Sequence, residues 1–306
     1  MFKNKHLIIW ASALLFSLCM VGCKSKFEKL KASNDNVAKY REAIRLYNNK
    51  KYSKALVLFE DLSNKYRGRP ENEELMYYFA YTNYRLRDYT SARFHFKNFT
   101  DQYPQSQRAE ECRFMYAYCY YLESPAYTLD QDNTLKAIEA LQLFINLYPK
   151  SDRAEEAAQF IADLRDKLEH KSFANAKLYL DVGDYKSAVI AFQNSLRDYP
   201  DTKYGEQMEF LAIKAQYLYA KNSMLNSQEG RYQDAIEFSD HFIDNYPESK
   251  YKKDAENLKK DSQRDIASVK KLIASLTPNQ KKKEEKLEEE QKNTNPKGSL
   301  PEQTLQ

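Results

Sequence analysis

The sequence predicts an all-α protein, an α-solenoid of about five helical hairpins, and three observations support this prediction. Only 6 of the 306 residues are glycine, which leaves few positions for the tight turns of β-hairpins. A pattern of small and aromatic residues recurs five times at fixed offsets, as in repeat architectures. Apolar residues upstream of these patterns follow a three-and-four spacing, which indicates amphipathic helices.

The chain begins with a segment typical of a secretory signal, residues 1–22. Two lysines precede an apolar run from Leu7 to Leu18, which is shorter than the roughly 20 residues that a membrane-spanning helix needs. The next residues, Met20-Val21-Gly22-Cys23, resemble the bacterial lipobox, in which cleavage before the cysteine leaves a lipidated amino terminus. The alternative is a plain secreted protein in which Cys23 is an incidental thiol.

Lipidation of Cys23 would attach the protein to a membrane without crossing it. Each buried methylene contributes about 0.8 kcal/mol, so that more than one acyl chain gives stable anchoring. Residues 23–36 are rich in Lys, Ser and Asn and are expected to form a tether to the first repeat. Two further cysteines, Cys112 and Cys119, are expected on one helix about 10.5 Å apart, too far for a disulfide, and are predicted to be buried thiols.

The repeated unit places an alanine three residues after a first anchor and, in four of the five copies, a large apolar residue four positions further on. The five copies are Tyr52-x2-Ala55-x3-Phe59, Tyr89-x2-Ala92-x3-Phe96, Thr134-x2-Ala137-x3-Leu141, Tyr185-x2-Ala188-x3-Phe192 and Tyr232-x2-Ala235-x3-Ser239. A tyrosine closes each copy fourteen residues after the anchor (Tyr66, Tyr103, Tyr148, Tyr199 and Tyr246), and a proline follows the last four. Residues four apart share one helix face, and proline ends a helix. Each copy is therefore predicted to be the second helix of a hairpin.

The first helix of each hairpin is expected upstream of its anchor, for example around Leu75 and Phe79 or around Met208 and Ala215. The unit resembles the tetratricopeptide repeat. Successive anchor alanines are 37, 45, 51 and 47 residues apart, more than the 34 of that family, which indicates insertions. The insertions are predicted to be a polar loop at 124–133, an extra helix within 151–170 after repeat three, and a loop at 222–230.

This spacing divides the chain into segments. Residues 37–150 are expected to hold repeats 1–3, and residues 151–276 the extra helix, repeats 4–5 and a capping helix that begins after Tyr251. Residues 277–306 are rich in charge and are expected to form a disordered tail.

The sequence carries no pattern typical of catalysis. The four histidines lie far apart, and there is no metal-binding spacing, phosphate-binding loop or Gly-x-Ser-x-Gly motif. A net charge of +4 over 92 charged groups gives no reason to expect nucleic-acid binding. Paired carboxylates such as Glu73-Glu74 and Glu110-Glu111 are assigned to helix starts, where negative charge complements the helix dipole. No enzyme activity, metal or cofactor is predicted, apart from the lipid on Cys23.

Tyrosines are the most unusual part of the composition, with 25 in the chain. Two predicted helices carry four each: Tyr77, Tyr78, Tyr81 and Tyr84 on one, and Tyr116, Tyr118, Tyr120 and Tyr121 on another. Such rings are suited to holding an extended peptide. The alternative is that they pack between hairpins with their hydroxyls toward water.

Taken together, the lipobox and the five hairpins resemble the BamD family, the helical lipoproteins of the outer-membrane β-barrel assembly machinery. The resemblance spans nearly all of the mature chain and is most specific over Ser151 to Tyr204. That stretch contains Ser-Asp-Arg-Ala-Glu-Glu-Ala, then Leu164-Arg165-Asp166-Lys167-Leu168, Leu178-Tyr179, Gly183-x-Tyr185 and Leu196-Arg197-Asp198-Tyr199-Pro200-Asp201-Thr202.

The resemblance implies an outer-membrane protein that is anchored by its lipid, faces the periplasm and works by binding. Its carboxy-terminal repeats would dock on periplasmic domains of the BamA barrel through turns around Asp181, Asp184, Arg197, Asp198 and Asp201. Its amino-terminal repeats would receive unfolded barrel substrates in a groove lined by Tyr66, Tyr78, Tyr81 and Tyr84. The Arg67-Gly68-Arg69-Pro70 segment after Tyr66 departs from the Tyr-Pro pattern. The other hypothesis is a tetratricopeptide lipoprotein scaffold for cell-wall synthesis or for a secretion or pilus apparatus.

Overall fold

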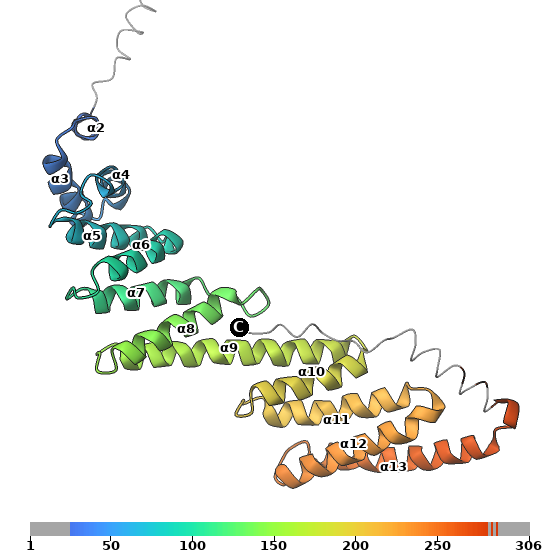
Figure 1. Cartoon of the computed structure of the whole chain (residues 1–306). Helices are drawn as coiled ribbons and strands as arrows, with labels where there is room; N and C mark the ends of the chain where they lie inside the picture. Colours follow the sequence, from blue (N-terminus) through green and yellow to red (C-terminus); the bar gives the residue numbers. More distant parts are fainter. Residues whose placement is uncertain (1–24, 281–282, 284–285, 287–306) are drawn as a thin grey trace, which may run out of the picture. The chain divides into compact units, whose positions relative to one another are not determined.

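The regular structure of this protein is entirely helical over the residues described by the computed structural model, which are 25–280, 283 and 286 (Figure 1). The helices are α2 (Lys26–Lys31), α3 (Asn36–Asn48), α4 (Tyr52–Ser63), α5 (Asn72–Arg85), α6 (Tyr89–Gln102), α7 (Ala109–Leu122), α8 (Asp132–Leu147), α9 (Ala154–Asp181), α10 (Tyr185–Asp198), α11 (Gly205–Lys221), α12 (Leu225–Asn245) and α13 (Lys252–Ser275). The predicted all-α class is confirmed. The predicted signal, Cys23 and most of the predicted tail lie outside the described residues.

The helices form at the positions that the repeat predicts. In three hairpins the second helix begins at the anchor tyrosine (α4, α6 and α10), and the side chain of Asp88 or Asp184 caps α6 or α10 by accepting a backbone N–H bond. Helices α6, α8, α10 and α12 each end one residue before the tyrosine that precedes proline. The alanine of every repeat is fully buried. These alanines allow neighbouring helices to approach closely.

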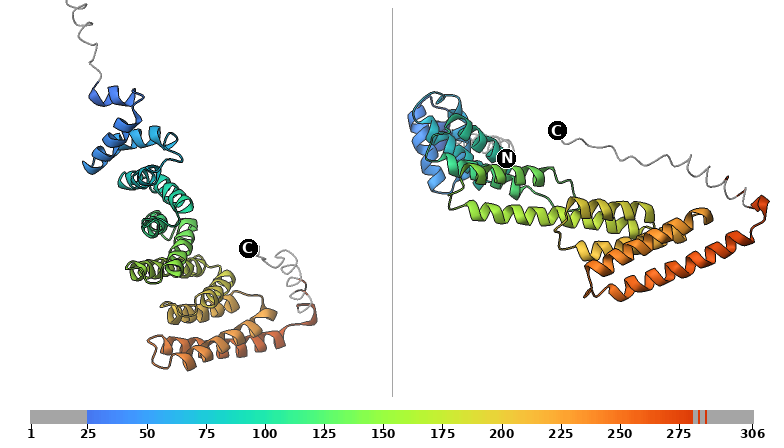
Figure 2. Two further views of the ribbon diagram at one scale, coloured as in Figure 1. Left: turned by 60° about the vertical axis from the view of Figure 1, so that its left-hand side comes forward. Right: turned by 60° about the horizontal axis from the view of Figure 1, so that its bottom comes forward.

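The chain divides into two compact units. The described residues of unit 1 are 25–125 and 130–162, and those of unit 2 are 126–129 and the residues from 163 onward. In unit 1, consecutive helices from α3 to α8 pack side by side, and in unit 2 the same holds from α10 to α13 (Figures 1 and 2). Buried aromatic residues, among them Phe59 and Phe96 in unit 1 and Phe192 and Phe242 in unit 2, fill the space beside the alanines.

The extra helix expected after repeat three is part of a longer one. Helix α9 runs unbroken for 28 residues from Ala154 to Asp181, so the inserted segment and the first helix of the fourth hairpin are continuous. No proline or glycine interrupts the sequence between these two residues, and nothing therefore ends the helix.

The loop predicted at residues 222–230 was largely wrong, because α12 begins at Leu225. Leu225 packs against the buried Tyr217 and Tyr232, and this contact favours helix where the polar composition suggested a loop. Gly230 lies inside α12, where glycine costs about 1 kcal/mol relative to alanine, and a Cβ at this position would point into open space.

The expected tether contains a short helix. Ser25 caps α2, and Phe27 packs on the core cluster that contains Ala43 and Leu58. The described end of this segment is therefore attached to the first hairpin.

Candidate functional site

Two of the four tyrosines predicted to line a substrate groove are buried in unit 1. Tyr66 is 3% exposed, stacks on Tyr40 with ring centroids 5.4 Å apart, and donates its hydroxyl to the Asn36 carbonyl at 3.2 Å. Tyr81 is 7% exposed and meets Phe96 edge-on at 5.0 Å. Both rings pack the core, and neither lines an open surface.

The first helices of unit 1 are joined by hydrogen bonds from tyrosine to glutamate. Tyr77 and Tyr81 of α5 both donate to Glu111 of α7, at 3.0 Å in the case of Tyr77, and Tyr40 of α3 donates to Glu74 of α5. Burial is the main cause that raises the pKa of all three tyrosines above the ordinary value, and the hydrogen-bonded carboxylates raise it further. The hydroxyls are therefore held protonated and act as donors.

The other two predicted groove tyrosines are half-buried on opposite sides of α5. Tyr78 contacts Tyr47 of α3 with centroids 5.0 Å apart, and Tyr84 contacts Tyr118 of α7 at 6.4 Å. These ring contacts continue to α9, where the ring centroid of Phe160 lies 5.3 Å from that of Tyr118.

Around the turn between α9 and α10 in unit 2, four large apolar side chains are exposed on the two helices and the turn, and we call this set the ridge. The ridge consists of Leu178, Tyr179, Val182 and Ile190, which are 59%, 44%, 68% and 44% exposed. Asp181 and Asp184 are exposed in the same turn, and Gly183 adopts a φ of +85°, a conformation that favours glycine. An exposed group of large apolar side chains is typical of a protein-binding surface.

The predicted docking residues do not form a single cluster. Arg197, Asp198 and Asp201 are exposed at the far end of α10, and Arg197 Nε lies 3.4 Å from Asp198 Oδ1. Because α10 has 14 residues at about 1.5 Å each, its two ends are about 20 Å apart. The ridge belongs to the Asp181–Asp184 end.

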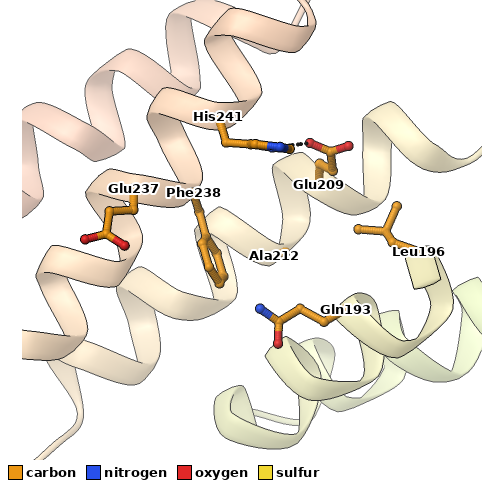
Figure 3. Close-up of a pocket in the computed structure, with 7 residues that line it drawn as sticks. All are labelled: Gln193, Leu196, Glu209, Ala212, Glu237, Phe238 and His241. Atoms are coloured by element: carbon orange, nitrogen blue, oxygen red, sulfur yellow. Dashed lines mark ion pairs between the residues drawn. The ribbon is translucent and has the colours of Figure 1, made fainter. Parts of the chain in front are cut away.

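A groove of about 400 Å³ lies in unit 2 between α10, α11 and α12 (Figure 3). Its lining residues are Gln193, Leu196, Glu209, Ala212, Glu237, Phe238 and His241. His241 Nδ1 lies 3.3 Å from Glu209 Oε2, while Glu209 Oε1 accepts the Tyr246 hydroxyl at 3.0 Å.

Sequence reasoning missed a role of the glutamates at the starts of the first helices. Glu73, Glu110 and Glu206 accept hydrogen bonds from Ser106, Ser151 and Ser249 at 2.6, 2.5 and 2.5 Å. Each of these serines lies two residues after the proline that closes a repeat, and this spacing was visible in the sequence. The glutamates thus join the start of a first helix to a later turn.

The described part of the chain offers no group of three or more side chains that could hold a metal ion. Within the same residues, no helix combines the length and apolar character needed to span a bilayer. The buried Cys112 and Cys119 are free thiols, as predicted.

Comparisons with known proteins identify the family. A search of curated proteins gives no significant match. Among solved structures, the chain is similar to one described as the TPR2AB-domain:pHSP90-complex of yeast Sti1, at 14% identity and a TM-score of 0.33, over 74% of this chain and 98% of that one. The family model described as YfiO, outer membrane lipoprotein, matches residues 32–229. The resemblance to the BamD family is thereby confirmed, and this protein belongs to the YfiO (BamD-like) family of outer membrane lipoproteins.

Proposed function

We propose that this protein is a component of the outer-membrane β-barrel assembly complex, anchored through a lipid on Cys23 and facing the periplasm. Unit 2 would bind the periplasmic domains of a BamA-like barrel protein, and unit 1 would receive unfolded barrel substrates. The observation that carries the proposal is the apolar ridge at the α9–α10 turn, in a chain of this lipoprotein family.

The ridge supports binding to a folded partner. Val182 and Leu178 expose more than half of their surface, and Asp181 and Asp184 lie beside them. This combination of an apolar centre and a charged rim is common in protein interfaces. At the other end of α10, Arg197 and its neighbours could form a second contact.

The two half-buried tyrosines of unit 1, Tyr78 and Tyr84, which we call the tyrosine surface, support binding of an extended substrate segment. Tyr78 and Tyr84 keep part of their rings exposed while neighbouring rings hold them in place, so little side-chain entropy is lost when a peptide binds. We assign Tyr66 and Tyr81 a packing role. One chain that holds a substrate and a barrel machine together raises the effective concentration of one near the other, without catalysis.

Site-specific photo-cross-linking in cells tests the proposal. A photoreactive residue at Val182 is expected to capture a barrel protein that has periplasmic domains, and one at Tyr84 is expected to capture outer-membrane barrel precursors. Leu272 is the matched control in unit 2, because it is 51% exposed on α13 and lies outside the ridge. Depletion of the protein is expected to lower the amounts of outer-membrane barrels.

A different set of adducts would refute the proposal. If Val182 captured cell-wall enzymes or secretion or pilus components and no barrel protein, the protein would be a scaffold of another kind. Unchanged barrel levels after depletion would lead to the same conclusion.

A further inference from the structure

The unit 2 groove has a counterpart at the equivalent place in unit 1. Each groove lies between two successive second helices and the first helix between them: α10, α11 and α12 in unit 2, and α4, α5 and α6 in unit 1. The unit 1 groove, of about 220 Å³, is lined by Ser63, Asn64, Arg67, Asn72, Met76, Phe79, Phe94, His95, Asn98 and Gln102. Counting from the buried alanines Ala92 and Ala235, residues 94, 95 and 98 correspond to residues 237, 238 and 241.

The two grooves differ in charge. Arg67 is the charged residue among those lining the unit 1 groove, which include no carboxylate. The unit 2 groove is lined by the carboxylates Glu209 and Glu237 and by no lysine or arginine. At the three corresponding positions of the second helices, unit 1 has Phe94, His95 and Asn98 where unit 2 has Glu237, Phe238 and His241.

The unit 2 groove combines an apolar floor with two negative charges, one half-buried and one exposed. Leu196, Ala212 and Phe238 supply the apolar contacts. Glu209 is held in place by Tyr246 and His241, and its side chain is only 19% exposed. Glu237 is exposed, and its carboxylate points outward at the edge of the groove (Figure 3).

We propose that the unit 2 groove binds a segment of a partner polypeptide in which an aromatic or aliphatic residue is flanked by lysine or arginine. The apolar residue would contact Phe238 and Leu196, and the cation would pair with Glu237 and Glu209. A volume of about 400 Å³ suits one or two side chains, and charge complementarity selects a basic segment over an acidic one. This partner site is additional to the ridge and to the tyrosine surface.

The carboxy-terminal end of the chain itself is a poorer match to this groove. Residues 281–306 contain six lysines and six glutamates and no aromatic residue, so they carry no net charge to attract them to the groove. A partner in trans therefore fits the groove better.

Fluorescence anisotropy with the full mature chain tests the proposal. The probe is an amidated, fluorescein-labelled peptide in which a phenylalanine is flanked by lysines. Two matched peptides carry glutamates in place of the lysines, or serine in place of the phenylalanine. The lysine–phenylalanine peptide is expected to bind with a Kd below about 1 mM, and each matched peptide about tenfold more weakly.

Protein variants connect this binding to the groove. Glu237→Lys should weaken binding of the basic peptide about tenfold and strengthen binding of the acidic one, because it reverses an exposed charge. Glu139→Lys makes the same charge change on exposed α8 in unit 1 and should leave both affinities unchanged. Circular dichroism should show that both variants remain folded.

Three results would overturn the proposal. One is equal binding of the three peptides, and another is a Glu237→Lys variant that behaves like Glu139→Lys. The third is tighter peptide binding after Lys281, Lys282 and Lys283 are changed to serine, which would mean that the chain's own end occupies the groove. None of these outcomes depends on the ridge or on barrel assembly, so this test is separate from that of the proposed function.

Discussion

Glu111 joins two hairpins of unit 1, and changing it to alanine should destabilise the protein strongly. The substitution removes the acceptor of both the Tyr81 hydroxyl and the Tyr77 hydroxyl. Tyr81 is 7% exposed, and leaving a buried donor unsatisfied costs about 1–3 kcal/mol. Tyr77 is half-buried and adds about 1 kcal/mol. The expected loss is about 2–4 kcal/mol.

Urea unfolding followed by far-UV circular dichroism measures this loss, and a double-mutant cycle assigns it to the hydrogen bond. In Tyr81→Phe the donor is absent, so Glu111→Ala should cost at least about 1 kcal/mol less in that background. Glu139→Ala, on the exposed face of α8, is the control and should change stability by less than about 0.5 kcal/mol. A cost for Glu111→Ala that is equally small, or that is the same in both backgrounds, would refute the reasoning.

Four further predictions concern single sites. Burial lowers the pKa of His95 to about 4, whereas the pKa in the unfolded chain is near 6.5, so the unfolded chain takes up the proton first as the pH falls. The Tm should therefore fall as the pH drops from about 6.5 to 4. The fall should be less steep in His95→Gln. Burial raises the pKa of Cys119 to about 12 and also raises that of Cys112, so Ellman's reagent at pH 8 should react with these two thiols only after unfolding in urea. Arg87 has a φ of +64°, and Arg87→Gly should raise the unfolding free energy by about 0.5–1 kcal/mol, measured in urea. Asp184→Ala removes the side-chain cap of α10 and should lower that free energy by about 1 kcal/mol in the same assay.

The fold could be predicted from the sequence because its determinants are local and repeated. The alanine that permits close helix packing and the tyrosine–proline pair that ends a helix recur in register. Composition misled where packing decides, as at Leu225: it packs partly buried on the cluster that contains Tyr217 and Tyr232, and α12 begins earlier than its polar neighbours suggested. The continuity of α9 follows from the absence of proline and glycine between its ends.

The candidate site could be predicted only in outline. The sequence indicated the α9–α10 turn through Asp181 and Asp184. The ridge beside it exists because Leu178 and Val182 are exposed, and helical spacing alone does not predict their exposure. The unit 2 groove could not be predicted, because its residues come from three helices and none of them forms a motif.

The residues that pack between the hairpins of unit 1 include tyrosines where phenylalanines would also fit, and the tyrosine hydroxyls add specificity to the packing. A phenylalanine at position 81 would fill the same space against any apolar neighbour, whereas the Tyr81 hydroxyl requires an acceptor at one place, which Glu111 supplies. Each such pair penalises a shifted or exchanged neighbour by leaving a buried polar group unsatisfied. The hydroxyls therefore specify which hairpin packs on which, and two of the four tyrosines in α5, Tyr77 and Tyr81, serve assembly of the stack in this way. Tyr78 and Tyr84 are instead placed by ring contacts with Tyr47 and Tyr118 and are only half-buried, so partner binding in unit 1 is best tested there.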